Sequence, residues 1–154
     1  MNDLGATLRD YAKRFQRERG SSQPSEIRDA ADETIQRLIA WSVGNADALT
    51  DRGPEGKDPA FGVAPAGGIA TVWRVYPRQA DGGKVTILSK AEHYLKPDER
   101  LRIVNVLEQL QPPTKIGDGQ RLEIGLARIA PDVQWARFSS LLSAAVEVAK
   151  RHRA

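Results

Sequence analysis

A short motif with one acidic and one basic residue lies inside a stretch rich in glycine and proline. Glu55 and Lys57 form the pattern (D/E)-x-K within DRGPEGKDPAFGVAPAGG, residues 51–68. In metal-dependent nucleases the carboxylate of this element holds Mg²⁺, and the lysine orients or activates the attacking water. Asp51 and two other nearby aspartates lie close enough in sequence to complete a carboxylate cluster. One hypothesis is therefore a small metal-dependent nuclease or hydrolase.

The alternative for the same stretch is a solvated connector between two parts of the chain. Glycines and prolines do not hold side chains in the rigid geometry that a catalytic site needs, and this favours the connector. A phosphate-binding loop is excluded, because Gly56–Lys57 is followed by Asp58 and not by Ser or Thr, and Gly53 is too close. The dinucleotide pattern G-x-G-x-x-G is absent as well, so we expect no cofactor.

His93 is the other catalytic candidate. It lies within KAEHYLKPDER and could act as a general base, with Glu92, Asp98 or Glu99 as its partner. No G-x-S-x-G motif accompanies it, and a lone histidine at a strand end is more typical of a structural or exposed residue. The missing catalytic set favours a non-enzymatic protein without deciding the matter.

Basic side chains at helical spacing indicate a surface that could follow a phosphate backbone. At 100° per residue, Arg9, Lys13 and Arg17 fall opposite the apolar stripe of an expected helix. Lys150 and Arg151 form a second basic cluster. The alternative is the ordinary charged outer face of an amphipathic helix, and the net charge of +3 is mild.

Two aromatic residues of one expected strand have different predicted roles. Tyr76 lies near the strand end with Arg74 on its face, and it is the candidate for stacking on nucleic-acid bases. Trp73 shares a face with Ile69 and Val75, so we expect it in the core.

The elements that must position these residues follow from hydrophobic periodicity. Helices are expected over residues 3–20, 24–42 and 97–110 and from residue 131 onward; strands are expected over 68–77, 84–89 and 120–128. In the third helix, the residues expected to face inward are Leu101, Val104, Leu107 and Leu110. The last strand could return by a parallel crossover beside the first.

The order of these elements predicts one α+β domain over residues 1–154. It comprises a helical hairpin (1–50), the connector (51–68) and a sheet–helix part (69–154). We expect a small, mostly antiparallel sheet of three or four strands in the order β-β-α-β-α, with helices packed on one face.

Composition sets the class of protein. The chain has no cysteine, no secretory signal and no run of about 20 apolar residues that could cross a membrane. These features favour a cytoplasmic protein away from membranes. The sequence as a whole predicts a binding or regulatory module whose partner is a protein or a nucleic-acid backbone.

Overall fold

The computed structural model has the α+β fold that the sequence predicts. It describes residues 4–45, 48–51, 60–64, 70–77, 80–89, 94–110, 116–117 and 120–151. Its helices are α1 (Leu4–Arg19), α2 (Ser25–Asn45), α3 (Pro97–Leu110) and α4 (Asp132–Arg151). Its strands are β1 (Ala48–Asp51), β2 (Phe61–Ala64), β3 (Trp73–Tyr76), β4 (Lys84–Ile87) and β5 (Glu123–Gly125), with short 3-10 helices η2 (Ala80–Gly82) and η3 (Leu126–Ile129).

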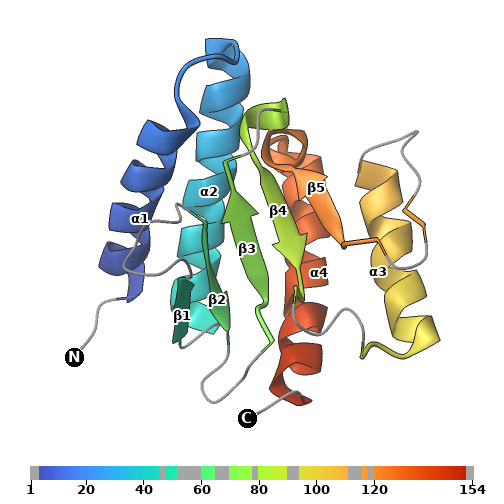
Figure 1. Ribbon diagram of the computed structural model, residues 1–154. Coiled ribbons are helices and arrows are strands. Elements are labelled where there is room, and N and C mark those ends of the chain that lie inside the picture. Colours follow the sequence, from blue (N-terminus) through green and yellow to red (C-terminus); the bar gives the residue numbers. More distant parts are fainter. Residues whose placement is uncertain are drawn as a thin grey trace.

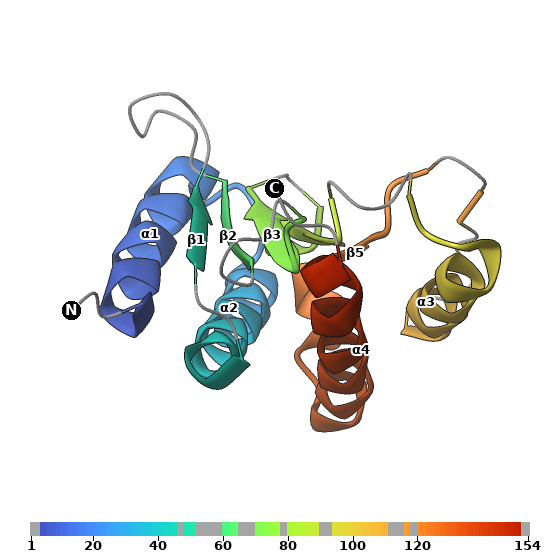
Figure 2. The same cartoon turned by 90° about the horizontal axis from the view of Figure 1, so that it is seen from below.

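The five strands form one antiparallel sheet in the order β1-β2-β3-β4-β5. Figures 1 and 2 show α2 and α4 against one face of this sheet, with α1 beside the β1 edge and α3 beyond β5. The expected helical hairpin, the antiparallel pairing and the placement of helices on one face are therefore confirmed. The two helices that flank the sheet, α1 and α3, lie at opposite ends of the molecule.

Strands β1 and β2 widen the sheet beyond the elements that periodicity identifies. Leu49 pairs with Val63, and Phe61 pairs with Val75 of β3. Residues 60–64 are buried, so this part of the expected connector is a strand of the sheet and not a solvated linker. Burial of the apolar side chains of Phe61 and Val63 away from water stabilises this strand in the sheet.

The return to the last strand is antiparallel, so the parallel crossover is wrong. Strand β5 pairs with β4, with Ile124 opposite Val85. Helix α3 packs on α4 beyond the sheet edge instead of crossing the sheet face (Figure 2). After α3 the chain therefore returns to the same edge of the sheet, where β5 pairs with β4.

An aromatic cluster joins α1 to the middle of the sheet. The ring of Phe61 lies 5.9 Å from Tyr11, 6.2 Å from Phe15 and 5.7 Å from Trp73, measured between centroids. Two of these contacts are edge-to-face, the arrangement that aromatic quadrupoles favour. Trp73 is fully buried, as expected, and its indole N–H donates to the Ser42 hydroxyl of α2 at 2.8 Å.

An ion pair links the two helices of the hairpin at the C-terminal end of α1. The Arg19 guanidinium donates to both carboxylate oxygens of Asp32 on α2, at 2.8 and 3.2 Å, and to the carbonyl oxygen of Gly82 at 3.2 Å. The Arg19 side chain is only 5% exposed, so its pairing is needed to offset the loss of water. This arginine ties α1 to α2 and to the β3–β4 connection.

One prediction for the third helix is wrong, because Leu101 does not face inward. Leu101 is 59% exposed, whereas Ile103 is 4% exposed and takes its place in the core beside Val104, Leu107 and Leu110. At about 100° per residue the four buried positions span a narrow arc, and Leu101 lies outside it. A helix packed mainly against one neighbour buries only such an arc.

None of the helices in the described part of the chain is long and apolar enough to cross a membrane.

Substitution of Gly62 tests the close approach of β2 and β3. A Cβ atom at this position would run into the carbonyl oxygen of Trp73 and lie 2.8 Å from the Cα of Arg74. We expect Gly62→Ala to lower the free energy of unfolding by more than about 2 kcal/mol, because backbone atoms must shift. Urea unfolding followed by tryptophan fluorescence measures the change.

Gly44→Ala is the matched control. Gly44 lies in α2 with nothing within 4 Å of an added Cβ, so the substitution should leave stability unchanged or raise it by up to about 1 kcal/mol. Equal stability of the two variants would contradict the close packing of β2 on β3.

Candidate functional site

The outer face of α1 carries the exposed basic residues that the sequence singles out. Leu8, Ala12 and Phe15 are buried on the inner face of this helix. Their burial fixes the rotation of the helix and leaves Arg9, Lys13 and Arg17 exposed on its solvent side. Successive residues of this basic face are four positions apart, which is about 6 Å along a helix axis.

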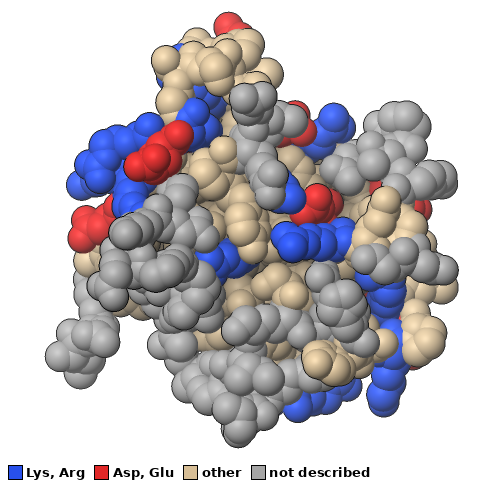
Figure 3. Space-filling model, viewed as in Figure 1, with Lys and Arg blue, Asp and Glu red and all other residues tan. Residues whose placement is uncertain are grey.

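These three cations have no hydrogen bond or ion pair with any residue that the structure describes. Asp10 and Glu18 lie on the same helix and dilute the positive charge. Figure 3 shows this mixture over α1, with blue basic groups at the upper left and red acidic groups beside them. The basic face, defined here as Arg9, Lys13 and Arg17, is therefore accessible to an anionic partner.

Arginines that lie between two structural elements form ion pairs within the protein. Arg37 of α2 pairs with Asp132 of α4 at 2.5 Å and with Glu33 at 3.1 Å. The hydrogen bond with Asp132 raises the pKa of Arg37 above its ordinary value. Arg128 pairs with Asp81 at 3.0 Å. The basic face of α1 differs from these residues because it joins no two elements within the described part of the chain.

The C-terminal basic cluster is also engaged. Arg151 pairs with Glu99 of α3, and Lys150 lies 3.7 Å from the carboxylate of Glu147. The hydrogen bond from Arg151 holds the pKa of Glu99 below its ordinary value, and the backbone N–H of Lys96 adds to this effect. An anionic partner would have to compete with these carboxylates for Lys150 and Arg151.

Tyr76 lies on the opposite face of the sheet from Trp73, which contacts α2, because side chains alternate along β3. The Arg74 guanidinium carbon and the Lys84 ammonium nitrogen each lie 5.6 Å from the centroid of its ring. Both distances are within the range of a cation–π contact. Lys84 also pairs with Glu123 at 2.8 Å. Tyr76, the residue predicted to stack on bases, is therefore flanked by two cations: Arg74 of the same strand and Lys84 at the paired position of β4.

The residues of the nuclease hypothesis fall almost entirely outside the described part of the chain. Asp51 ends β1, but Glu55 and Lys57 are not among the described residues, and neither is His93. Across the described ranges there is no cluster of three or more histidines or carboxylates that could hold a metal ion. Glu99, one expected partner of His93, is paired with Arg151.

A groove between α3 and α4 is a second candidate site, and no sequence pattern indicates it. Its rim includes Glu99, Arg102 and Arg151. Glu99 and Arg151 are 52 positions apart in sequence. No local pattern brings such residues together, so only the packing of α3 on α4 reveals the groove.

Comparison with known protein families, curated proteins and solved structures finds no match to this chain.

Removal of Arg151 tests the ion pair that closes one end of the groove. Because Arg151 is the main cause of the lowered pKa of Glu99, Arg151→Gln should bring that pKa back up toward its ordinary value. The side-chain carboxyl carbon of Glu99, followed by NMR during a pH titration, reports the change directly.

The same pair should contribute to stability in a pH-dependent way. A carboxyl group with a lowered pKa stabilises the folded protein above its ordinary pKa, and this stabilisation is lost as the pH falls through the folded pKa. Arg151→Gln should therefore reduce the difference in stability between neutral and acidic pH. An unchanged titration of Glu99 in the variant would contradict the pair.

Proposed function

We propose that this protein is a non-enzymatic binding module that contacts a nucleic-acid backbone through the basic face of α1. The observation that carries the proposal is that Arg9, Lys13 and Arg17 are exposed and unpaired among the described residues. Cations that already have carboxylate partners must break those pairs to bind phosphate, and these three do not.

The arrangement suits contacts to phosphates more than contacts to bases. A single row of long basic side chains on a surface helix can neutralise phosphates along a strand, which positions the partner without reading its sequence. A helix that enters a groove to read bases has phosphates on both sides, and the exposed carboxylate of Asp10, next to Arg17 around the helix, disfavours that position. We therefore expect binding with little sequence preference.

The salt dependence of binding provides a quantitative test of the proposal. Each phosphate contact contributes about −0.9 to the slope of log K against log salt for duplex DNA, so three contacts predict a slope of about −2.7. The triple substitution Arg9→Gln, Lys13→Gln and Arg17→Gln should flatten the slope nearly to zero. Fluorescence anisotropy with a labelled duplex at several salt concentrations measures it.

The stability of the triple variant should not change much. The three side chains are exposed, and glutamine has a helix propensity close to that of arginine and lysine. We expect the free energy of unfolding to stay within about 0.5 kcal/mol of that of the wild type. A large loss of stability would make a loss of binding uninterpretable, and single variants would then replace the triple one.

A second triple variant separates the basic face from overall charge. Arg102, Arg121 and Arg137 are also exposed and unpaired among the described residues, but they lie outside α1. Their substitution by glutamine removes the same charge and should leave the slope near that of the wild type. Equal effects of the two variants, or no binding at about 50 mM salt, would overturn the proposal and favour a protein partner.

A further inference from the structure

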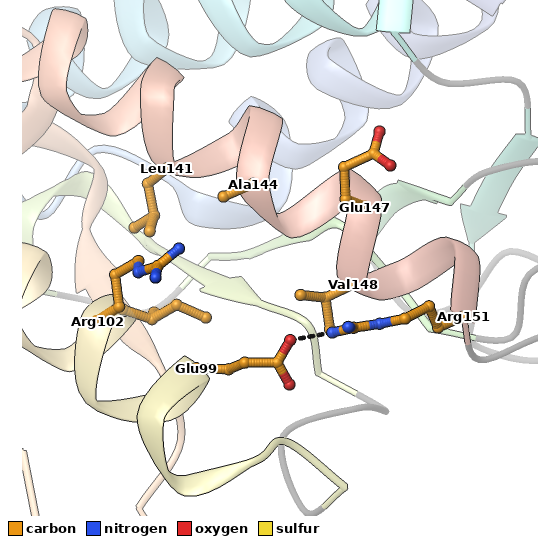
Figure 4. A pocket seen from close by; sticks show the side chains of 8 residues that line it. Glu99, Arg102, Leu141, Ala144, Glu147, Val148 and Arg151 are labelled. Atoms are coloured by element: carbon orange, nitrogen blue, oxygen red, sulfur yellow. Dashed lines mark hydrogen bonds and ion pairs between the residues drawn. The ribbon is translucent and has the colours of Figure 1, made fainter.

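The groove between α3 and α4 has an apolar floor. It encloses about 290 Å³ and is lined on its floor by Ile103 of α3 and by Leu141, Ala144 and Val148 of α4. Ile103, Leu141 and Val148 are buried, whereas Ala144 is exposed, so the groove is open to solvent along α4. Figure 4 shows the two helices on either side of it. This volume of about 290 Å³ is just below the usual range for small-molecule sites, about 300–1,000 Å³.

Among the residues that the structure describes, one cation at the rim of the groove has no partner. Glu99 is paired with Arg151, and Glu147 is paired with Lys150 at 3.7 Å. Arg102 has no hydrogen bond or ion pair with the residues that the structure describes. In Figure 4 its guanidinium group turns from α3 toward α4, over the groove, whereas the carboxylate of Glu147 points away from the Glu99–Arg151 pair.

We propose that this groove binds a small amphipathic carboxylate, with its hydrocarbon chain on the apolar floor and its carboxylate on Arg102. A guanidinium group presents its N–H donors in a planar fork that matches the two oxygens of a carboxylate. The hydrocarbon chain would remove apolar surface of Ile103, Leu141 and Val148 from water. The Glu99–Arg151 pair closes one end of the groove and limits the length of the chain.

The size and charge of the groove select this class of ligand. A closed cavity of about 150 Å³ already admits benzene, so about 290 Å³ holds a short chain but not a lipid with two chains. Glu99 and Arg151 neutralise each other, and Glu147 lies 3.7 Å from Lys150, which is outside the groove; with Lys150 counted, the net charge is that of Arg102. A single negative charge on the ligand balances it, whereas a cationic amphiphile would meet an unfavourable charge.

This site is separate from the one proposed on α1. Helices α1 and α3 lie at opposite ends of the molecule in both views (Figures 1 and 2). Either proposal can fail without the other, because the groove contains none of the residues of the basic face.

Binding of three probes with the same chain length tests the proposal. Octanoate, octanol and octyltrimethylammonium are titrated into the full chain by isothermal titration calorimetry, and shifts of backbone amide signals in NMR spectra locate the site. We expect octanoate to bind at millimolar concentration or below, with shifts at Ile103, Leu141 and Val148. Octanol should bind about tenfold more weakly, because it lacks the charge that pairs with Arg102.

Two variants and one control distinguish the charge from the apolar floor. Arg102→Gln should weaken octanoate about tenfold and leave octanol unchanged. Ala144→Leu should weaken both, because the larger side chain fills the groove while keeping good helix propensity. Arg137→Gln removes an exposed arginine of α4 outside the groove and should change neither. Thermal unfolding of all three variants checks that each is folded.

The results that would overturn the proposal are specific. Octanoate and octanol of equal affinity, or an unchanged affinity of octanoate for Arg102→Gln, would show an apolar groove without selectivity for anions. Absence of binding at millimolar octanoate, or shifts confined to other parts of the chain, would remove the site altogether.

Discussion

The hydrogen bond between the Trp73 indole and Ser42 is the interaction on which the rest of the structure depends. Trp73 is fully buried in the central strand, and its N–H has to find a partner there or lose a hydrogen bond to water. The Ser42 hydroxyl accepts this bond at 2.8 Å and donates to the carbonyl oxygen of Leu38 at 2.7 Å. Because Ser42 belongs to α2, the pair fixes where that helix crosses the sheet.

The position of the basic face follows from this pair through a chain of packed rings. Trp73 contacts Phe61 of β2, and Phe61 contacts Tyr11 and Phe15 on the inner side of α1. These contacts set the rotation of α1 about its own axis. A helix held on one side by aromatic rings has to present Arg9, Lys13 and Arg17 on the other side. The surface proposed to bind nucleic acid is thus a consequence of the core, although none of its three residues contributes to the core.

The sequence predicts the elements with strong periodicity and misses those that depend on distant partners. The bounds expected for the third helix, residues 97–110, are those of α3, because Pro97 starts it and a run of breakers follows Leu110. Strand β2 is only four residues long and lies between glycines and prolines, so FGVA gives no periodic signal. It is a strand because β1 and β3 supply hydrogen-bond partners on both sides.

The same distinction applies to the candidate sites. The basic face of α1 can be read from a spacing of four residues, since a helix brings such residues to one side. The groove cannot be read in this way, because Glu99 and Arg151 meet only after α3 has packed on α4. Leu101 illustrates the limit of periodicity within one helix, because burial there depends on where the neighbouring helix lies.

Charged residues have two separate roles in this protein, and the distinction supports the assignment of both surfaces. Arg37 and Arg151 join elements that are distant in sequence, Arg19 joins α1 to α2, and removing their partners would leave structural charges unpaired. An anion that bound to them would compete with the fold itself. The basic face of α1 and the Arg102 guanidinium are not committed in this way within the described chain. A partner can therefore be bound at either surface without breaking an ion pair that stabilises the structure.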